Sequence, residues 1–225
     1  MRISVVIPTL NAANELSVCL NQLRVAGSFV AEVIVVDGGS VDDTRIIATA
    51  EGARVVVCPP GRGLQLQTGA REASGQWLLF LHADTLLDSD WAVVAQRFID
   101  DPDKQNRAGV FQLALNDRSN AARRLERIVT WRSRILALPY GDQGLMLSRA
   151  LYDEVGGYTA LPIMEDVDII RRLGRKRVVC LESTATTSAK RYLRDGWRRR
   201  SARNLFCLSL YYCGVSPRLI KRLYG

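Results

Sequence analysis

Histidine is nearly absent from this sequence, and cysteine lacks any metal-binding arrangement. His82 is the single histidine, and the five cysteines form neither a C-x-x-C pair nor a zinc-binding spacing. Structural zinc sites need four such ligands at short spacings, which argues against a zinc-binding module. Cys19, Cys58 and Cys180 each lie in an apolar pattern, and we expect them to be small core residues in a reducing compartment.

Long apolar runs and common nucleotide-binding fingerprints are also missing. No apolar run approaches the roughly 18 residues of a membrane-spanning helix. The opening MRISVVIPTL runs into a strand rather than a signal peptide. We therefore expect a cytoplasmic protein, with peripheral contact at the inner membrane surface as an open alternative. The segments GGSVDDT and GRGLQLQTG lack G-x-G-x-x-G and the P-loop lysine, which argues against an NAD-binding or P-loop protein.

Acidic residues are outnumbered by basic ones, 23 against 31, and the net charge is +8. This charge predicts an anionic partner, which could be nucleic acid, membrane headgroups or a phosphorylated small molecule. We disfavour nucleic acid because no RNA-binding aromatic pattern accompanies the arginines. At 225 residues and 48% hydrophobic content, the chain can bury the core of a single domain.

Short apolar runs alternate with amphipathic segments in the first half. The expected strands are ISVVIP, EVIVVD, RVVVC and QWLLFLH, with a helix after each of the first three. This alternation predicts an α/β fold with a mostly parallel sheet buried on both faces. In the second half AGVFQLALN alternates as an antiparallel or edge strand would, and a basic helix is expected over residues 119–138. The loop PYGDQG, two helices, the strand RVVCLE and a basic helical end complete the order.

Three expected parallel strands end in polar side chains. Ligands of such sheets bind at the carboxyl ends of strands, so one crevice is expected to gather Asn11, Asp37, Ser40, His82 and Asp84. Asp37 and Ser40 have an alternative interpretation as a turn that caps the next helix. Asp84 follows a fully apolar strand and could hold a divalent cation that bridges a diphosphate, since such ions prefer oxygen ligands.

The segment PIMEDVDII places two acids at the start of a helix. Asp166 shares its face with Ile170 and Leu173, so its carboxylate is expected on the packed side, where partial desolvation would make it a better proton acceptor. Glu165 lies on a more mixed face. The alternative is that these acids only stabilise the helix dipole.

Five segments in this order resemble the family 2 glycosyltransferases: VVIPTLN, VIVVDGGSVDDT, GRGLQLQTGAREASGQWLLFLHADT, YGDQGLMLSRALYDEVGGY and PIMEDVDIIRRL. The resemblance covers nearly the whole chain and implies the GT-A fold with a helical C-terminal segment. It implies one domain, 1–225, with a nucleotide-binding half (1–88), an acceptor half (89–190) and basic C-terminal helices (191–225). LFLHADT, GDQG, MEDVD, TSAKRY and the closing YYCGVSPRLIKRLYG resemble a small bacterial subgroup named for association with rSAM/selenodomain proteins or arsenosugar biosynthesis.

The resemblance also assigns roles to single residues. Its nucleotide-binding set is Pro8, Thr9, Asn11, Asp37, Ser40, Arg62, Gln65 and His82, and its diphosphate-binding pair is Lys190 and Arg191, ahead of Tyr192. Its acceptor-side set is Tyr140, Gly141, Asp142 and Gln143. Asp84 matches the metal-binding second acid of an acid-x-acid motif. In the catalytic pair Glu165 and Asp166, Asp166 matches the base that deprotonates the acceptor hydroxyl.

Two positions depart from the family pattern. Ala12 replaces the usual acid after the first loop's asparagine, although Glu15 follows three residues later. His82 replaces the first acid of acid-x-acid, which weakens the implied metal site. A supporting role, a contact with ribose or sugar, and metal ligation are the three interpretations of His82.

The implied enzyme is an inverting glycosyltransferase that uses a UDP- or GDP-sugar donor, Mn²⁺ or Mg²⁺, and a hydroxyl acceptor. The alternatives are a nucleotidyltransferase on a similar sheet, a non-catalytic relative, and a basic nucleic-acid-binding module.

Near the C-terminus, Leu205, Leu208, Tyr211 and Tyr212 form an apolar stripe beside arginines. We favour a helix packed on the core; a homodimer contact and an interfacial membrane helix that delivers a lipid acceptor are the alternatives.

Overall fold

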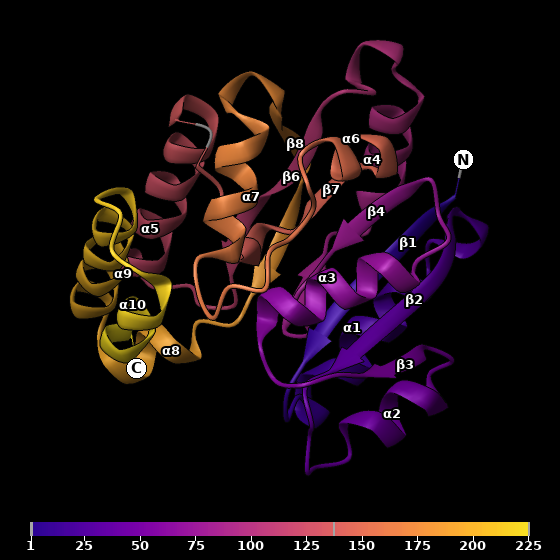
Figure 1. The fold of residues 1–225 in the computed structure, drawn as a ribbon, viewed down its shortest axis with the longest axis horizontal. Helices are drawn as coiled ribbons and strands as arrows, with labels where there is room; N and C mark the ends of the chain where they lie inside the picture. The colour runs from indigo at the N-terminus through magenta and orange to yellow at the C-terminus, as the bar shows by residue number, and fades with distance from the viewer. Residues whose placement is uncertain (1, 137, 225) are drawn as a thin grey trace.

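The apolar runs of the sequence form one sheet with the strand order β3-β2-β1-β4-β7-β6-β8-β5 in the computed structural model, which describes residues 2–136 and 138–224 (Figure 1). The strands are β1 (Ile3–Thr9), β2 (Val30–Asp37), β3 (Arg54–Val57), β4 (Trp77–Phe80), β5 (Thr85–Leu87), β6 (Ala108–Leu115), β7 (Leu145–Ser148) and β8 (Val178–Thr187). The helices are α1 (Ala13–Arg24), α2 (Thr44–Ala50), α3 (Arg62–Glu72), α4 (Trp91–Asp100), α5 (Asn120–Trp131), α6 (Arg149–Glu154), α7 (Glu165–Leu173), α8 (Lys190–Asp195), α9 (Trp197–Tyr212) and α10 (Pro217–Tyr224).

The four strands predicted from the first half are parallel, as expected. β3, β2, β1 and β4 are neighbours in that order, with Thr9 paired with Asp37 and Asp37 paired with Val57. β1 and β4 are buried along nearly their whole length, which explains their continuous apolar runs. The carboxyl ends of these strands therefore meet at one edge of the sheet, where the polar residues follow.

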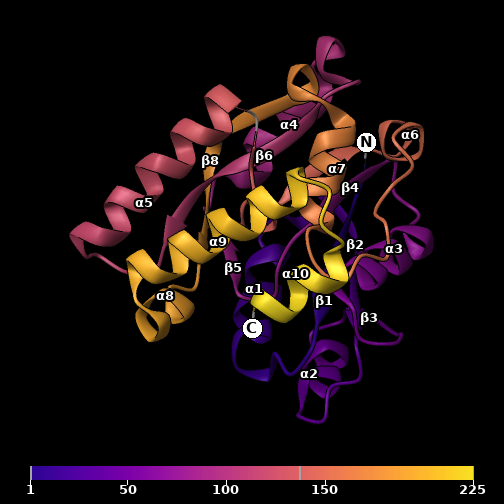
Figure 2. The same ribbon diagram turned by 60° about the vertical axis from the view of Figure 1, so that its left-hand side comes forward.

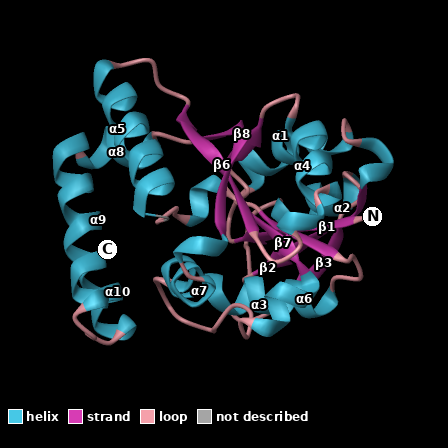
Figure 3. Ribbon diagram, turned by 90° about the horizontal axis from the view of Figure 1, so that it is seen from above, coloured by secondary structure: helices cyan, strands magenta, loops and turns pink. Residues whose placement is uncertain are grey.

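Helices cover both faces of the sheet and make three layers (Figure 3). α1 and α4 pack on one face through Leu16, Cys19 and Trp91, and α3, α6 and α7 pack on the other through residues such as Leu66 and Ile169. The architecture is thus the α/β fold that the alternation predicts: a mostly parallel sheet flanked by helices, followed by a helical C-terminal segment.

The second half differs from the expectation in several elements. β7 was not anticipated; it follows the polar loop and pairs antiparallel with both β4 and β6. β6 is antiparallel to β7 as expected, but it is an interior strand, because β8 pairs with it on its other side. β5 and α4 were also missed, because three strand residues and one amphipathic helix give weak local signals. The helix expected over residues 119–138 ends at Trp131 and continues as a wider turn, Arg132–Leu136; residue 137 lies outside the described residues.

The C-terminal helices α8, α9 and α10 lie together beside α5 (Figures 1 and 2). Cys207, Leu208 and Ile220 pack against Ile163 and Met164, just before α7. This contact confirms the favoured interpretation for part of the apolar stripe, since Leu208 is buried, while Leu205 and Tyr212 are exposed. Within the described part of the chain, no helix is both long and apolar enough to cross a membrane.

Candidate functional site

A pocket of about 630 Å³ lies at the carboxyl edge of the sheet. It is lined by residues after β1 and β4, by the start of α3, by the loop before β7, and by the segments from α7 to α10. Of the residues that the sequence singled out, the pocket is lined by Pro8, Thr9, Asn11, Arg62, Gln65, His82, Asp84, Tyr140, Gly141, Asp142, Asp166, Arg191 and Tyr192. Asp37, Ser40, Gln143, Glu165 and Lys190 are not among its lining residues.

The first loop is held in an uncommon backbone conformation at the pocket wall. Asn11 has a φ of 53°, in the left-handed region that asparagine tolerates better than most residues. Its backbone N–H donates to Ser40 Oγ at 2.8 Å, and its side-chain oxygen accepts from the Val41 N–H at 3.0 Å. The turn after β2 therefore fixes the shape of the loop after β1.

Asp37 organises that turn and does not reach the pocket. Its side chain is fully buried and accepts hydrogen bonds from the backbone N–H groups of Gly39 and Ser40 at 3.1 and 2.9 Å, and from the Ser40 hydroxyl. The expectation that Asp37 and Ser40 share the crevice with Asn11 is therefore corrected, and the turn interpretation describes them better. Buried carboxylates require such partners, which is why the turn has this sequence.

Gln65 lies in the pocket wall, but its amide braces the sheet. Its Nε2 donates to the carbonyl oxygens of Thr9 and Val36 at 2.7 and 2.8 Å. The amide thus joins α3 to the ends of β1 and β2, so the structure supports a bracing role more directly than the expected contact with the nucleotide. Gly63 lets the same helix approach the loop before α7, because a Cβ at this position would lie 2.4 Å from the Thr159 carbonyl oxygen.

His82 and Asp84 follow β4 and both face the pocket. Burial, together with the nearby Arg62 and Arg191 guanidinium groups, lowers the pKa of His82 to about 3, so its imidazole is neutral. Its Nε2 lies 3.0 Å from the position that a Cβ on Gly141 would occupy, which places the ring against that loop and beside Asp166. Burial raises the pKa of Asp84, and Arg191 opposes that rise.

The raised pKa of Asp84 is the feature that fits a divalent cation, because a bound cation would compensate the poorly solvated negative charge. Among the described residues, no group of three or more His, Cys, Asp or Glu side chains is arranged to hold a metal ion. The donor set therefore fits an ion that takes most of its ligands from a bound diphosphate and water.

The acid pair at the start of α7 divides into a buried and a pocket-facing residue. Glu165 is 1% exposed and forms an ion pair with Arg62, whereas Asp166 lines the pocket. The expectation that Asp166 is on the packed side is therefore wrong in detail. Met164 precedes the helix with a φ of 67°, and this backbone turn sets how the first helical residues project. Burial raises the pKa of Glu165, and Arg62 opposes the rise.

Asp166 is positioned by backbone groups. Its Oδ2 accepts from the Gly141 N–H at 2.8 Å, and its Oδ1 accepts from its neighbour, the Val167 N–H, at 2.8 Å. A side chain at Gly141 would meet both His82 Nε2 and Asp166 Oδ2, at 3.0 and 3.4 Å from its Cβ. A side chain here would force His82 to shift by a few tenths of an ångström, so glycine at 141 lets the loop approach α7 this closely.

The loop before β7 contributes Tyr140 and Asp142 to the pocket. Burial raises the pKa of Asp142 to about 6, an effect that Arg132 opposes and Asp166 reinforces. The Arg132 guanidinium lies over the Tyr140 ring, 3.6 Å from its centroid. Gln143 is fully buried and braces the loop instead, because its amide donates to the Phe111 carbonyl at 2.9 Å and accepts from the Ser133 hydroxyl at 3.0 Å. Its expected acceptor-side role is corrected to that bracing.

The two basic residues at the start of α8 point to different surroundings. Arg191 lines the pocket, whereas Lys190 forms an ion pair with Glu15 at 2.5 Å. Of the expected diphosphate-binding pair, only Arg191 is therefore among the pocket-lining residues. Tyr192 also lines the pocket and stacks on Trp197, with ring centroids 5.2 Å apart.

Among the pocket residues that were not anticipated, four polar ones belong to the last two helices: Arg200, Asn204, Lys221 and Tyr224. Arg200 is buried, and its guanidinium lies over the Tyr224 ring, 4.5 Å from the centroid. Arg200, Asn204 and Leu208 recur every four residues, so they share one face of α9. This four-residue spacing was the sequence signal that could have placed Arg200 and Asn204 on the same side of the helix as Leu208.

The chain is similar to known proteins in both sequence and fold. The family model "Glycosyl transferase family 2" matches residues 4–161. A PGL/p-HBAD biosynthesis glycosyltransferase from Mycobacterium bovis (strain BCG / Pasteur 1173P2) is 31% identical over 167 residues, which are 69% of this chain and 62% of that protein. The chain therefore spans less than two thirds of the length of this relative.

Two solved structures share the fold. S. aureus TarS 1-349 in complex with UDP has a TM-score of 0.64 and 19% identity, and the match covers 100% of this chain and 70% of that one. Glucosyl-3-phosphoglycerate synthase from Mycobacterium tuberculosis, in complex with Mn²⁺, UDP and glucosyl-3-phosphoglycerate, has a TM-score of 0.59 and 23% identity, with coverage of 95% and 80%.

Proposed function

The chain belongs to glycosyl transferase family 2, and from this membership we propose that it transfers a sugar from a UDP-sugar to a hydroxyl acceptor. The proposal rests on two carboxylates that line the same pocket. Asp84 follows the parallel strand β4, and Asp166 lies at the start of α7. Arg62, at the start of α3, and Arg191, in α8, line the same pocket. One anionic group for a cation, one for a proton and two guanidinium groups for phosphate are the groups that this reaction needs.

The nucleotide is proposed to lie against the first loop and α3. Pro8, Thr9 and Asn11 line this part of the pocket, and Asp37, Ser40 and Gln65 hold those residues in place from behind. The role of Asp37 and Ser40 in nucleotide binding is thus indirect in our proposal. The choice of UDP over GDP is supported by the UDP complexes of the two structural neighbours.

A divalent cation, when bound, would supply positive charge for the diphosphate that leaves, and Asp84 is the residue proposed to hold it. The neighbour with Mn²⁺ and UDP supports this choice of ion. Arg191 is proposed to add a fixed positive charge on the same side. His82 is neutral, so we propose that it supports Gly141 and contacts a sugar hydroxyl as a hydrogen-bond partner rather than as a charge.

Asp166 is the proposed general base. It would accept the proton of the acceptor hydroxyl while the acceptor oxygen attacks the anomeric carbon from the side opposite the leaving diphosphate, which inverts that carbon. The Gly141 N–H at 2.8 Å fixes one carboxylate oxygen, so the orientation of the base is set before the substrate binds. Glu165 is proposed to act only through its ion pair with Arg62, as a positioning residue.

The product distinguishes this proposal from its rival, a nucleotidyltransferase. The protein should be incubated with Mn²⁺ and a panel of UDP-sugars, and separately with uridine triphosphate and sugar phosphates. We expect slow UDP release by donor hydrolysis, accelerated when a matching hydroxyl acceptor is present. Pyrophosphate release from the triphosphate, without UDP release from any UDP-sugar, would contradict the proposal.

A further inference from the structure

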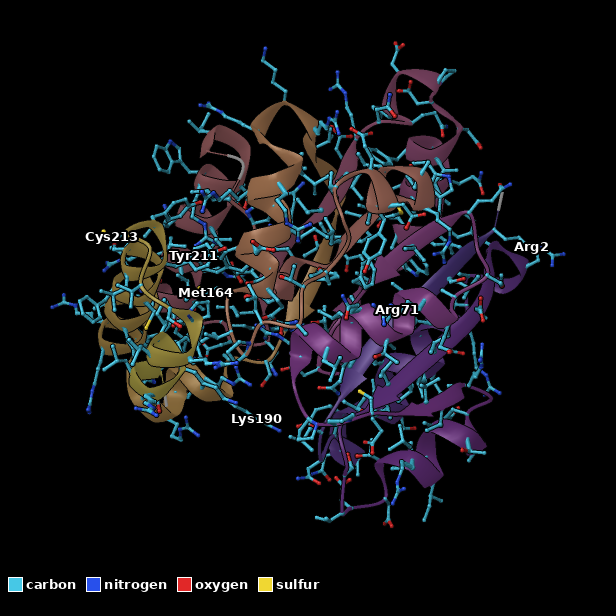
Figure 4. The ribbon with its side chains drawn as sticks, in the orientation of Figure 1. Arg2, Arg71, Met164, Lys190, Tyr211 and Cys213 are labelled. Atoms are coloured by element: carbon cyan, nitrogen blue, oxygen red, sulfur yellow. The ribbon has the colours of Figure 1, made fainter. Side chains whose placement is uncertain are left out.

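The outward face of α9 is apolar although it is exposed. Leu205 is 63% exposed, Phe206 56% and Tyr212 48%. Leu205 and Phe206 project outside the face that carries the buried residues Cys207 and Leu208, and Tyr212 is exposed at the last turn of the helix. On α10, Leu219 and Leu223 are also about half exposed. Figure 4 shows Cys213, at the end of α9, at the outer side of the molecule, away from the sheet. We call Leu205, Phe206, Tyr212, Leu219 and Leu223 the outer apolar face.

The charge of the protein is concentrated in the same segment. Residues 190–224 contain ten lysines and arginines and one acid, Asp195, whereas the rest of the chain contains 21 basic and 22 acidic residues. The net charge of +8 therefore originates in this segment. Arg198 and Arg199 are exposed at the first turn of α9, and Arg218 and Arg222 are exposed on α10. Exposed apolar side chains flanked by arginine and lysine are the pattern of a helix that lies in a membrane interface.

We propose that α9 and α10 bind the surface of a bilayer that contains anionic lipids. The positive charge favours an anionic bilayer over a second copy of the chain as the partner, because a symmetric contact between two copies would bring two strongly positive segments together. Anionic headgroups instead attract each basic residue near the surface, while the outer apolar face enters the acyl boundary. No described helix spans a bilayer, so the contact is peripheral.

The opposite face of α9 lines the pocket through Arg200, Asn204 and Leu208, and α10 contributes Lys221 and Tyr224. One pair of helices thus carries the lipid-binding face on one side and the pocket wall on the other. A bilayer on the outer face would hold the pocket near the lipid–water boundary. That the pocket would receive a membrane-embedded acceptor in this position rests on the proposed function, whereas the proposed lipid binding does not.

Flotation with lipid vesicles tests the binding directly. The full chain should bind vesicles of phosphatidylcholine mixed with phosphatidylglycerol, bind pure phosphatidylcholine far more weakly, and dissociate as salt is raised. L205S/F206S should weaken binding about tenfold or more, because it removes two apolar side chains from the interface. R198Q/R199Q should weaken it by roughly fivefold per charge at low salt.

Matched variants on other surfaces control for general effects. I46S/V93S removes exposed apolar side chains of α2 and α4, and R2Q/R71Q removes two exposed charges that Figure 4 places on the other side of the molecule. Both should bind vesicles like the wild type. Unchanged circular dichroism melting and UDP affinity would show that L205S/F206S is folded.

Three results would overturn the proposal: no binding of the wild type to anionic vesicles, equal losses in the control variants, or a dimer that L205S/F206S dissociates while vesicle binding is unaffected. Vesicle binding without any UDP-sugar turnover would uphold the lipid-binding surface and count against the proposed function alone.

Discussion

The two sides of the pocket differ in how their polar groups are satisfied. On the nucleotide side, the buried carboxylate of Asp37 and the buried amide of Gln65 are hydrogen bonded to backbone and hydroxyl groups of neighbouring turns. On the proposed acceptor side, only Asp142 and Asn204 line the pocket among the residues whose buried polar atoms have no protein hydrogen-bond partner in the described part of the chain: Arg132 Nε and Nη2, Asp142 Oδ1, Glu165 Oε2, Arg203 Nε and Asn204 Oδ1. All of them belong to residues after position 130.

This difference separates a wall whose buried polar groups are satisfied within the protein from one in which Asp142 and Asn204 can take a partner from ligand or water. Unpaired buried polar atoms cost free energy, so they persist where ligand or water supplies the missing partners. The nucleotide side is therefore expected to be rigid and to bind with little rearrangement, while the acceptor side is expected to tighten when substrate is present.

The largest effect is expected from Asp166→Asn on the acceptor side. Removing the proposed base should lower turnover about a thousandfold while leaving UDP affinity nearly unchanged, because the amide keeps the side-chain volume. Steady-state kinetics and UDP titration measure the two quantities. Asp153→Asn, an exposed acid on α6, is the matched control. Equal loss of turnover and UDP affinity would contradict the assignment.

Asp37→Ala tests the nucleotide side through stability. It would leave the Ser40 hydroxyl and the backbone N–H groups of Gly39 and Ser40 without their buried acceptor, which should lower the free energy of unfolding by about 3 kcal/mol. UDP affinity should fall with it, since Ser40 holds Asn11 in the first loop. Chemical denaturation and UDP titration measure both. The exposed neighbour Asp43→Ala should change neither, and a stable Asp37→Ala protein that has lost UDP binding would argue for direct contact instead.

Asp142→Asn should raise the free energy of unfolding, whereas Asp37→Ala should lower it. Burial raises the pKa of Asp142 from 3.8 to about 6, so the folded state holds its proton more tightly than the unfolded state. That contribution is complete below the unfolded pKa and is lost as pH rises through the folded pKa. Asparagine mimics the protonated acid, so the variant should be more stable than wild type by about 3 kcal/mol above neutral pH and equal to it near pH 3.

Thermal or urea unfolding across this pH range measures the difference. A variant that is less stable than wild type at high pH would show that the ionised carboxylate is well satisfied. That result would remove the contrast between the two sides at this residue.

The smallest effect is expected from the basic pair at the start of α8. Arg191→Ala should weaken UDP binding about tenfold, because it removes a pocket-facing charge near the diphosphate. Lys190→Ala should change UDP affinity by less than about twofold, because the Lys190 side chain is 72% exposed, forms an ion pair with Glu15 and is not among the pocket-lining residues. Calorimetric titration of both variants measures this difference. Equal effects would restore the pair as joint diphosphate ligands.

The nucleotide half was predictable because its signals are local. Strand runs, the residues that end them and the glycine turns determine which side chains reach one edge of a parallel sheet, and Asn11, His82 and Asp84 do line the pocket. The sequence could not tell a pocket residue from one that holds it in place. Asp37 and Gln65 match a binding pattern, but their side chains satisfy backbone groups, and that choice depends on packing.

The acceptor half was less predictable because distant segments build it. The helical period placed Asp166 on the packed face, yet Glu165 is the buried member, since its partner Arg62 comes from α3 and the backbone turns at Met164. β7 is a short strand that forms only between β4 and β6. Arg200 was one of several arginines, and only the packing of α9 shows that it faces the pocket.

Titration of UDP with and without Mn²⁺ shows whether Asp84 supports cation-dependent binding of a nucleoside diphosphate. Wild-type protein should bind UDP much more tightly with Mn²⁺, and Asp84→Asn should remove that difference while leaving the weak, Mn²⁺-independent binding intact. UDP binding that is indifferent to Mn²⁺ in the wild type, or an Asp84→Asn protein with the full Mn²⁺ effect, would contradict the account.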